Sequence, residues 1–442
     1  MEDDTAGTAR LGDAAADVLR RNDLGHLTVA APELYPHQWS WDTAFIAIGL
    51  SHLSVSRAIT EMSSLLTAQW RRGMIPHIVF DTAPGYFPGP ERWRTAVASD
   101  APAGVQTSGI CQPPVHSVAV ARILDQARRR GGADRRAAEE FLTESLDGWL
   151  AWHRWLATSR DPEGSGLVEI HHSWESGMDN SPRWDAPYSR VDAGEMEPFT
   201  RNDTTHVTDA AERPTDAEYR RYIWLVDQMV AARYDEEAIR RTIDFRVADV
   251  FASALLALSS EILAELAAGA GRHRDARDME EIAARFRSGV IAAVSPRSGL
   301  AQDRDLRTGA WLPTATIGGF APLLCGGDVA VVRRQRELLL GPEWCGHPDL
   351  RHAVPPSTSP TSPEFRPRQY WRGPQWPVIT WLFGWAARRR GDEALEGQLR
   401  EESLRQLGDL RFAEYYEPFT GEALGSRSQS WTAAVALDWL AS

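Results

Sequence analysis

Lysine is absent from this chain of 442 residues, so all 48 basic residues are arginines. Together with the alanine and glycine content, this indicates a G+C-rich genome but no particular function. Cysteine is also scarce: Cys111, Cys325 and Cys345 lie far apart, with no C-x-x-C pair and no zinc-ligand spacing. We therefore expect reduced thiols in a cytoplasmic protein.

Long apolar runs and targeting signals are missing as well. The longest apolar candidate, PVITWLFGWAA, stops at three arginines and is shorter than the roughly 20 residues that a membrane span needs. The N-terminus, MEDDTAGTARLGDAAADVLRR, is acidic and amphipathic, whereas a signal peptide has a basic start followed by an apolar core. We expect neither a signal peptide nor a membrane partner.

Acidic residues are in excess: 61 Asp and Glu give a formal net charge of −13. This charge disfavours a nucleic acid or an anionic membrane surface as partner. An anionic small substrate would need a local cationic clamp to overcome it. The sequence leaves open whether the chain forms a homo-oligomer.

Several catalytic signatures do not occur. His171 and His172 are adjacent, so they cannot share one helix face, and there is no H-E-x-x-H motif. The sequence also has no G-x-S-x-G nucleophile elbow, no P-loop and no dinucleotide fingerprint. The histidines thus give no metal pattern.

Tryptophan, in contrast, is abundant, with 18 Trp against 13 Phe and 9 Tyr. An indole ring offers a flat face to the C–H surface of a sugar and an N–H donor to its hydroxyls. Heavy use of Trp in the core is an equal alternative on this feature alone.

Helical periodicity dominates the chain. We expect helices at residues 8–21, 54–73, 115–129, 137–156, 216–233, 274–294, 328–340, 376–389, 392–407 and 429–440, with two more inside 236–271. Strand signals are scarce apart from 166–170. About a dozen helices without a readable repeat argue against a solenoid. They predict an all-α (α/α)6 barrel that takes up residues 1–442 as a single domain.

Four long connections separate these helices, at residues 73–114, 173–214, 357–377 and 410–427. Connections beyond about 15 residues are uncommon in compact domains unless they form lids or binding loops. Because they hold many of the Trp, Tyr and isolated acidic residues, we expect them to converge on one pocket at one end of the barrel. Residues 180–215 are the expected lid.

The stretch SWESGMDNSPRWD places Asp179 between Trp174 and Trp184. Hydrolysis of an acetal needs one protonated and one ionised carboxyl group, and a dry aromatic environment raises a carboxyl pKa. Asp179 suits the proton donor, and Gly177 would let the backbone approach a ligand. The alternative is an Asp that caps a helix.

The second carboxylate must come from elsewhere. In FAEYYEPFTGEALG, Glu414 and Glu417 both stand among aromatic residues before a turn. Either suits a general base, and an exposed acid beside a hairpin is the alternative.

Two further stretches are dense in aromatic residues. In YPHQWSWDTAF, Asp42 precedes a helix, so that it would cap this helix, accept bonds from sugar hydroxyls, or do both. In QYWRGPQWP, Tyr370, Trp371 and Trp376 are spaced to surround a ring, and Arg372 would be an ion-pair partner or a clamp. His77 would donate to a hydroxyl or be structural.

These motifs stand in the order seen in trehalases and glycoside hydrolase family 63. ESGMDNSPRWD resembles the acid signature of that group, YPHQWSWDTAF its early "WD" signature, QYWRGPQWP its late W-R-G-P-x-W loop and FAEYYEP its base motif. LLTAQWRRGMIPHIVF, GYFPGPERW, SGICQPPVH, DAEYRRYIWL and SQSWTAA are similar to the actinobacterial glucosylglycerate hydrolases. The resemblance extends over nearly the whole chain.

The resemblance implies an (α/α)6 barrel, inverting hydrolysis of glucosylglycerate or mannosylglycerate, and no metal or organic cofactor. It implies Asp179 as general acid and Glu414, rather than Glu417, as general base. The implied sugar contacts are Tyr35, Trp39, Trp41, Asp42, His77, Tyr86, Gln112, Trp174, Gly177, Tyr370, Trp371 and Trp376. Arg213 and Tyr219 would hold the glycerate carboxylate, with Gln429 nearby.

Three alternatives accompany this hypothesis. A trehalase-like or oligosaccharide α-glucosidase would not depend on Arg213. A non-catalytic sugar-binding protein would keep the tryptophans without needing paired acids. An α/α-barrel cyclase would want an apolar pocket, which the Gln, His, Tyr and Arg of these loops disfavour.

Overall fold

Six helices form a closed ring in the computed structural model, which describes residues 2–442 except 82–84, 202 and 205–208. Each helix contacts the next, and the last contacts the first. In ring order they are α2 (Ser40–Leu53), α5 (His116–Arg130), α10 (Val250–Gly269), α12 (Ala321–Cys325), α14 (Pro377–Arg389) and α16 (Ser430–Leu440). Stretches such as SWDTAFIAIGL in α2 are buried throughout, as expected for a helix that is apolar on every side.

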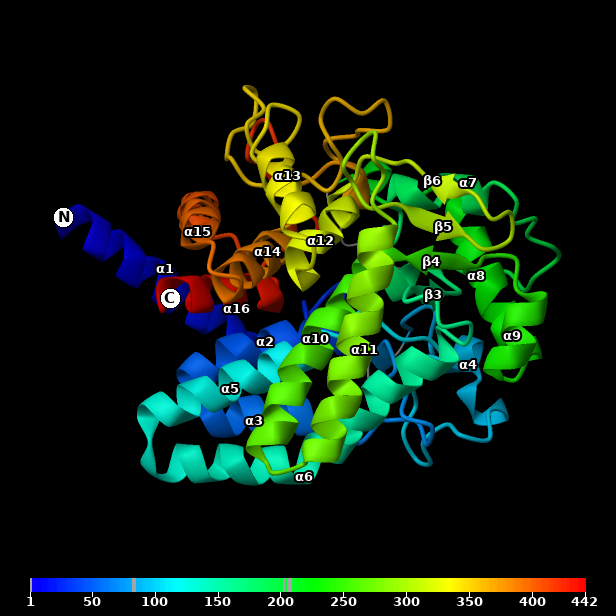
Figure 1. The fold of residues 1–442 in the computed structure, drawn as a ribbon, viewed down its shortest axis with the longest axis horizontal. Coiled ribbons are helices and arrows are strands. Elements are labelled where there is room, and N and C mark those ends of the chain that lie inside the picture. The colour runs from blue at the N-terminus through cyan, green and yellow to red at the C-terminus, as the bar shows by residue number, and fades with distance from the viewer. Residues whose placement is uncertain (1, 82–84, 202, 205–208) are drawn as a thin grey trace.

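A second layer of helices surrounds the ring (Figure 1). Its members are α1 (Glu2–Asn22), α3 (Val55–Leu66), α6 (Gly132–Ser159), α11 (His273–Ala292), α13 (Val329–Leu339) and α15 (Glu393–Leu407). They are amphipathic: α3, for example, buries Ala58, Met62 and Leu65, which are spaced three or four residues apart. Outer and inner helices alternate along the chain, so the predicted (α/α)6 barrel is confirmed.

Helix α10 was not recognised as the most apolar segment. By length and composition it could cross a membrane, with a mean hydropathy of 1.7, but 89% of that window is buried inside the fold. Glu261 and Glu265 interrupt its apolar run, so the uncharged part before them, residues 250–260, is no longer than PVITWLFGWAA. In this structure α10 is a core helix, packed between α5, α11 and α12.

Most predicted helices are present with shifted ends. Residues 236–271 contain α9 (Glu236–Thr242) and α10, separated by strand β4 (Val247–Asp249). The predicted helix at 54–73 already ends at Leu66. The other helices are α4 (Pro90–Trp93), α7 (Asp185–Tyr188) and α8 (Asp216–Ala231).

Short strands join the loops. β3 (Val168–Ile170), β4, β5 (Asp303–Asp305) and β6 (Trp311–Leu312) form an antiparallel sheet in that order. Two further pairs are β1 (Gln38–Trp39) with β2 (Ile78–Val79), and β7 (Tyr415–Tyr416) with β8 (Ala423–Leu424). Strands of two or three residues are too short for an alternating pattern, so only β3 was anticipated.

The segments that lead into the ring helices meet at one end of the barrel. The β1–β2 pair joins the segments before α2 and α5, and an isolated bridge between Gln375 and Tyr416 joins those before α14 and α16. Ser430 N–H donates to the Ala30 carbonyl across 2.8 Å, which closes the circle back to α2. These contacts gather the aromatic and acidic loops at one end, as predicted.

A single carboxylate ties four ring helices together at the opposite end. Asp438 of α16 accepts bonds from His52 Nε2 of α2 (2.8 Å), from Trp381 Nε1 of α14 (3.1 Å) and from the Arg122 guanidinium of α5. Burial alone would raise the pKa of Asp438, but His52 and Arg122 outweigh burial and lower it. The ionised clamp therefore stabilises the closed ring.

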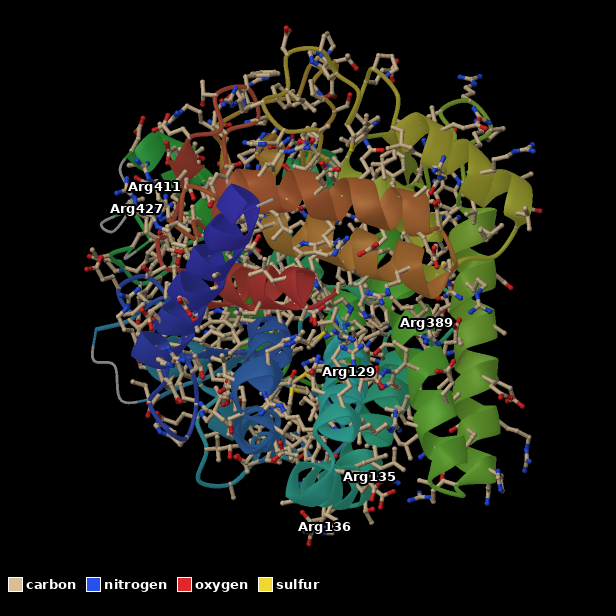
Figure 2. All side chains as sticks on the ribbon, turned by 90° about the vertical axis from the view of Figure 1, so that its left-hand side faces the viewer. Arg129, Arg135, Arg136, Arg389, Arg411 and Arg427 are labelled. Atoms are coloured by element: carbon tan, nitrogen blue, oxygen red, sulfur yellow. The ribbon has the colours of Figure 1, made fainter. Side chains whose placement is uncertain are left out.

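Arginines supply the cations of the outer surface. Arg129, Arg135 and Arg136 extend from α5 and α6 (Figure 2). Arg389, at the end of α14, pairs with Glu261 and Glu265 of α10. This ion pair between helices therefore uses a guanidinium group.

Candidate active site

A pocket with an empty volume of about 410 Å³ lies at the end of the barrel where the ring helices begin. It is lined by Tyr35, Trp39, Trp41, Asp42, His77, Gln112, Gly177, Asp179, Tyr370, Trp371, Glu414, Gln429 and Trp431. A wider hollow between α1 and α15 is lined by helix-surface residues such as Arg400 and Glu401. It lacks paired carboxylates and stacked rings, so the chemistry belongs to the smaller pocket.

Asp179 reaches the pocket from a tight turn. Gly177, two residues earlier, has φ +70° and lies against the Trp41 ring, where an added Cβ would come within 2.6 Å of the indole. Burial raises the pKa of Asp179 to about 7; Arg213 opposes this rise and Glu414 adds to it. Asp179 caps no helix, and its pKa keeps it partly protonated near neutral pH.

Glu414 lies in the same pocket in a different environment. Its carboxylate accepts from the Tyr35 hydroxyl at 2.7 Å, from the Ser426 backbone N–H at 3.0 Å and from Arg213 Nη2 at 3.2 Å. Three donors, one of them cationic, hold this carboxylate in place. The two carboxyl groups therefore have different hydrogen-bonding environments.

Arg213 reaches Glu414 from the predicted lid. Its side chain is buried and its guanidinium lies over the Tyr370 ring, 4.4 Å from the centroid. Arg213 Nε is buried without a hydrogen-bond partner among the described residues. Residues 202 and 205–208 of the predicted lid at 180–215 lie outside the described residues.

Asp42 is the third carboxyl group of the pocket. It lies in the first turn of α2, whose N-cap is Trp39, and it makes no capping bond. The prediction that Asp42 precedes this helix was therefore wrong, and of its two expected roles, helix cap and acceptor for sugar hydroxyls, the cap is not present. Burial raises the pKa of Asp42 well above its usual range, and Glu414 and Asp179 add to the shift.

Neutral polar groups complete the lining. Gln112 Oε1 accepts from the Trp41 backbone N–H at 3.2 Å, and Gln429 Oε1 accepts from the Ser426 hydroxyl at 2.6 Å. Both amides therefore keep their NH₂ groups for a ligand. Burial lowers the pKa of His77 to about 3, so its imidazole is neutral.

Stacked rings hold the aromatic wall. Trp371 and Trp376 are parallel, with centroids 3.6 Å apart, and Trp376 Nε1 donates to the Tyr370 carbonyl. Trp376 thus supports Trp371 from behind and does not line the pocket. Trp174 likewise stacks on His77 from outside the lining, at 6.0 Å.

Tyr86 and Tyr219 lie farther out than the resemblance implied. Tyr86 meets the Trp39 ring edge-on at 5.8 Å. Tyr219 is on α8, its hydroxyl points to the Phe87 carbonyl at 3.4 Å, and Arg201 covers its ring. Neither lines the pocket in this structure.

Within the described part of the chain, no three His, Cys, Asp or Glu side chains are grouped so that they could hold a metal ion. The pocket instead combines an acid whose pKa is raised to about 7, a second carboxyl group held by three donors, and aromatic walls. A pair of carboxyl groups in a sugar-sized aromatic pocket is typical of a glycoside hydrolase.

The profile of the mannosylglycerate hydrolase MGH1-like glycoside hydrolase domain matches residues 35–432. The chain belongs to this family. It is 53% identical to glucosylglycerate hydrolase from Mycolicibacterium hassiacum, over 98% of both chains. It is 39% identical to mannosylglycerate hydrolase from Thermus thermophilus, over 96% of this chain and 99% of that one.

A solved relative has the same fold. A glycoside hydrolase family 63 mannosylglycerate hydrolase from Thermus thermophilus, in complex with Tris and D-glycerate, superposes with a TM-score of 0.88. The two chains are 38% identical over 97% of this chain and 99% of the relative. The predicted membership of family 63 is confirmed.

In this family-63 hydrolase, two charged candidates of the sequence have structural roles. Glu417 accepts from the Phe419 and Thr420 backbones and so caps the β7–β8 turn. Arg372 makes a bidentate ion pair with Asp185, with both distances 2.7 Å. Glu414 is thus the acid of its motif that faces the pocket.

Glu175 anchors the loop that carries Asp179. It is buried and accepts from both terminal nitrogens of Arg160, at 2.8 and 2.9 Å, and from the His171 backbone. Burial would raise the pKa of Glu175, but Arg160 outweighs burial and lowers it to about 2. Glu175 and Asp179 of SWESGMDNSPRWD therefore differ in function: Glu175 holds the loop and Asp179 faces the pocket.

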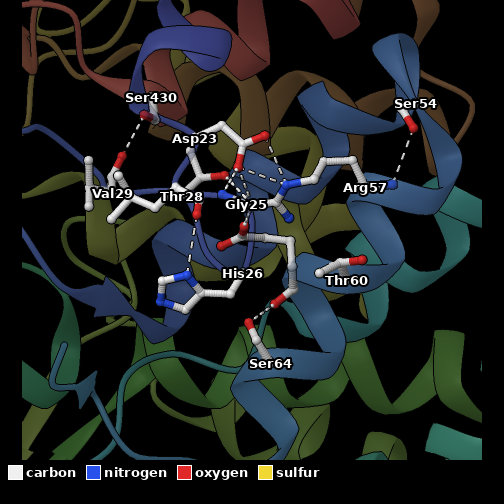
Figure 3. A network of polar contacts seen from close by, with 12 residues as sticks. Asp23, Gly25, His26, Thr28, Val29, Ser54, Arg57, Thr60, Ser64 and Ser430 are labelled. Atoms are coloured by element: carbon white, nitrogen blue, oxygen red, sulfur yellow. Dashed lines mark hydrogen bonds and ion pairs between the residues drawn. The ribbon is translucent and has the colours of Figure 1, made fainter.

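A second network fixes the segment that carries Tyr35 and Trp39. Arg57 of α3 binds Asp23 (Figure 3). It also binds Glu61, and Gln38 Nε2 donates to Glu61 and Ser64. Gln38 precedes Trp39 in β1, so this network sets the position of the indole at the pocket.

Sequence reasoning missed Trp431 as a lining residue. It belongs to SQSWTAA, the motif that also contains Gln429, and it meets the Trp41 ring edge-on at 5.5 Å. Its place two residues after Gln429, at the start of a ring helix, was the available signal.

Proposed function

We propose that this enzyme hydrolyses glucosylglycerate to glucose and glycerate with inversion at the anomeric carbon. The observation that carries the proposal is the meeting of two carboxyl groups in one pocket beside the buried cation Arg213: Asp179, whose pKa burial raises to about 7, and Glu414, which accepts bonds from Tyr35 and Arg213. An acid that keeps its proton and a base that stays ionised are the pair that acetal hydrolysis needs.

In the proposed reaction, Asp179 gives its proton to the glycosidic oxygen as the bond to the anomeric carbon breaks. A water molecule attacks that carbon from the other face while Glu414 takes its proton. Glycerate leaves with its hydroxyl restored, and glucose carries the oxygen of water. Tyr35 and Ser426 hold Glu414 in place during the step.

The substrate carboxylate requires a cation at the pocket edge. Arg213 is suited to this role because its guanidinium can bind a carboxylate through two bonds. The solved relative from Thermus thermophilus, in complex with D-glycerate, supports a glycerate-binding site in this chain, and the position of Arg213 beside Glu414 supports its role there. A trehalase-like enzyme acting on neutral disaccharides would have no use for such a cation.

The sugar is assigned by similarity. The relative that shares 53% identity is a glucosylglycerate hydrolase, while the relative that shares 39% identity is a mannosylglycerate hydrolase. We therefore propose glucosylglycerate as the main substrate and mannosylglycerate as a second one. The three unpaired, buried cysteines support action in a reducing compartment such as the cytoplasm.

Purified enzyme tests the proposal directly. Glucose release should be fast from glucosylglycerate, slower mannose release should occur from mannosylglycerate, and trehalose should be inert. Proton NMR of the first product should show β-glucose, the inverted anomer of an α-glucoside. Hydrolysis of trehalose at the same rate, or α-glucose as the first product, would contradict the substrate or the mechanism respectively.

Variants at the two carboxyl groups complete the test. Asp179→Asn and Glu414→Gln should each lower kcat by about 10²- to 10⁴-fold. The melting temperature should stay close to wild type in Asp179→Asn and fall in Glu414→Gln, which leaves the buried Arg213 without its carboxylate partner. Glu417→Gln is the matched control and should keep most of the activity, because Glu417 caps a turn outside the pocket.

A further inference from the structure

The side chain of Arg368 connects its own loop to two other loops. Its Nη2 donates to Glu212 Oε1 at 2.7 Å, and its Nη1 donates to Glu422 Oε2 at 2.6 Å. Glu212 belongs to the predicted lid, Glu422 to the β7–β8 hairpin and Arg368 to the loop before α14. One guanidinium thus joins three loops that are far apart in sequence.

Each of the three loops carries a residue of the site close to its contact with Arg368. Arg213 directly follows Glu212, Tyr370 stands two residues after Arg368, and Glu414 directly precedes the strand that pairs with the one after Glu422. Arg213 in turn contacts both Tyr370 and Glu414. The contacts of Arg368 and the contacts of Arg213 therefore connect the same three loops.

The contact is built asymmetrically. The Glu212 side chain is only 2% exposed, whereas Arg368 and Glu422 are 40% and 48% exposed. A carboxylate that is buried against a single cation depends on that cation, while an exposed pair contributes little by itself. Arg411 and Arg427 lie at the same edge of the molecule (Figure 2) and lower the pKa of Glu422, after the larger effect of Arg368. Of the two carboxylates that Arg368 binds, Glu212 is thus the one that depends on it.

We infer that Arg368 is a positioning residue that holds Arg213 over the pocket and thereby sets the affinity for the substrate's carboxylate, a role that rests on the proposed function. Arg368 does not line the pocket, so it acts through Arg213. When the three loops separate, Arg213 leaves the place where a carboxylate can be bound. The apparent affinity is then the affinity of the joined state multiplied by the fraction of molecules in which the three loops are joined.

Steady-state kinetics on glucosylglycerate test the inference with a matched control. Arg368→Gln should raise KM about tenfold and change kcat less than about twofold. Arg366→Gln removes a guanidinium two residues away whose hydrogen bonds, among the described residues, go to the Pro363 and Phe365 carbonyls of its own loop. It should leave both constants unchanged, and an equal rise in KM in both variants would overturn the inference.

A double-mutant cycle separates positioning from general weakening. If Arg368 acts through Arg213, adding Arg368→Gln to Arg213→Gln should change KM by less than about twofold. The same tenfold rise on both backgrounds, or no rise in either, would overturn the inference. Should Arg368→Gln fail to fold, Glu422→Gln removes only the exposed carboxylate that Arg368 binds and should show a smaller rise with the same dependence on Arg213.

Calorimetric titration with D-glycerate repeats the test without turnover, and Arg368→Gln should weaken binding about as much as it raises KM. A wild-type enzyme that binds glycerate but does not cleave glucosylglycerate would overturn the proposed function alone. A wild-type enzyme that cleaves the substrate, with glycerate affinity unchanged in Arg368→Gln, would overturn the role of Arg368 alone.

Discussion

Asp179 and Glu414 are chemically similar groups that their surroundings make different. Asp179 receives no side-chain hydrogen bond among the described residues and is governed by burial, whereas Glu414 has three donors. The difference arises because the partners of Glu414 come from the segment before α2, from the predicted lid and from the far side of its own hairpin. The loops around the pocket therefore give its two carboxyl groups different environments.

The pH profile should report the proton donor. Since the pKa of Asp179 is raised to about 7, the protonated form is lost as pH rises through 7. We expect kcat/KM for glucosylglycerate to fall on the alkaline side with a midpoint near pH 7. A profile that stays flat from pH 6 to pH 9 would contradict the assignment of Asp179 as the acid.

Arg213 offers a test of substrate charge. Arg213→Gln should raise KM for glucosylglycerate by about 10- to 100-fold, the worth of one or two charge-assisted bonds. Hydrolysis of glucosylglycerol, a neutral analogue, should change much less. Equal losses on the charged and the neutral substrate would show that Arg213 does not recognise the carboxylate.

Much of the site could be predicted from sequence because its residues stand in short dense motifs. Asp179, Asp42 and the pair Tyr370–Trp371 each lie within a few residues of other lining groups. The Arg213–Glu414 ion pair could not be predicted, since it joins positions 201 residues apart through loops without periodicity. Trp376 was placed in the lining because spacing alone does not distinguish a ring that faces a ligand from one that supports it.

At the scale of elements, the turn before Asp179 depends on two properties of Gly177. It has φ +70°, and it leaves no room for a Cβ beside Trp41. The loop can approach the indole only because glycine provides both. The position of Asp179 therefore depends on a residue that makes no side-chain contact of its own.

Gly177→Ala should destabilise the fold by about 1–3 kcal/mol and lower kcat by displacing Asp179 or Trp41. Gly164→Ala is the matched control, because Gly164 has the same φ of +70° but nothing within 4 Å of an added Cβ. The difference in unfolding free energy between the two variants isolates the contact with Trp41. If Gly177→Ala and Gly164→Ala had the same effect on stability and the same effect on kcat, the strain of a positive φ alone would explain both variants.

The helices were easier to predict than the strands. Outer helices show their amphipathic period over several turns, as α3 does, but β1, β2, β7 and β8 each contain two residues. Strands of that length arise from tertiary pairing between loops and leave no local pattern. Likewise, the first part of ring helix α10, residues 250–260, is uncharged and buried throughout, so no helical period marks where the helix begins.

At the scale of the whole molecule, ring closure rests on contacts between the first and last inner helices. α16 packs against α2, and Asp438 adds polar bonds to α2, α5 and α14. Such a buried carboxylate is costly to leave unpaired and costly to remove from its partners. It lies at the far end of the ring helices from the pocket.

Asp438→Asn should lower the free energy of unfolding at pH 7 by about 3–5 kcal/mol without changing kcat at 25 °C. The folded-state pKa of Asp438 lies below its ordinary value of 3.8, so its contribution is complete above pH 4 and is lost as pH falls through the folded pKa. The stability difference from wild type should therefore shrink in acid. Asp17→Asn, at an exposed surface pair, is the control and should have little effect.

The separation of Asp438 from Asp179 along the ring has a practical consequence. One rim of the torus can be re-engineered for heat tolerance, or used to fix the enzyme to a solid support, while the catalytic rim keeps its rate and selectivity. Because lysine is absent, amine-directed coupling would find no side chain to react with, so a lysine introduced on the Asp438 rim would become a unique side-chain attachment point.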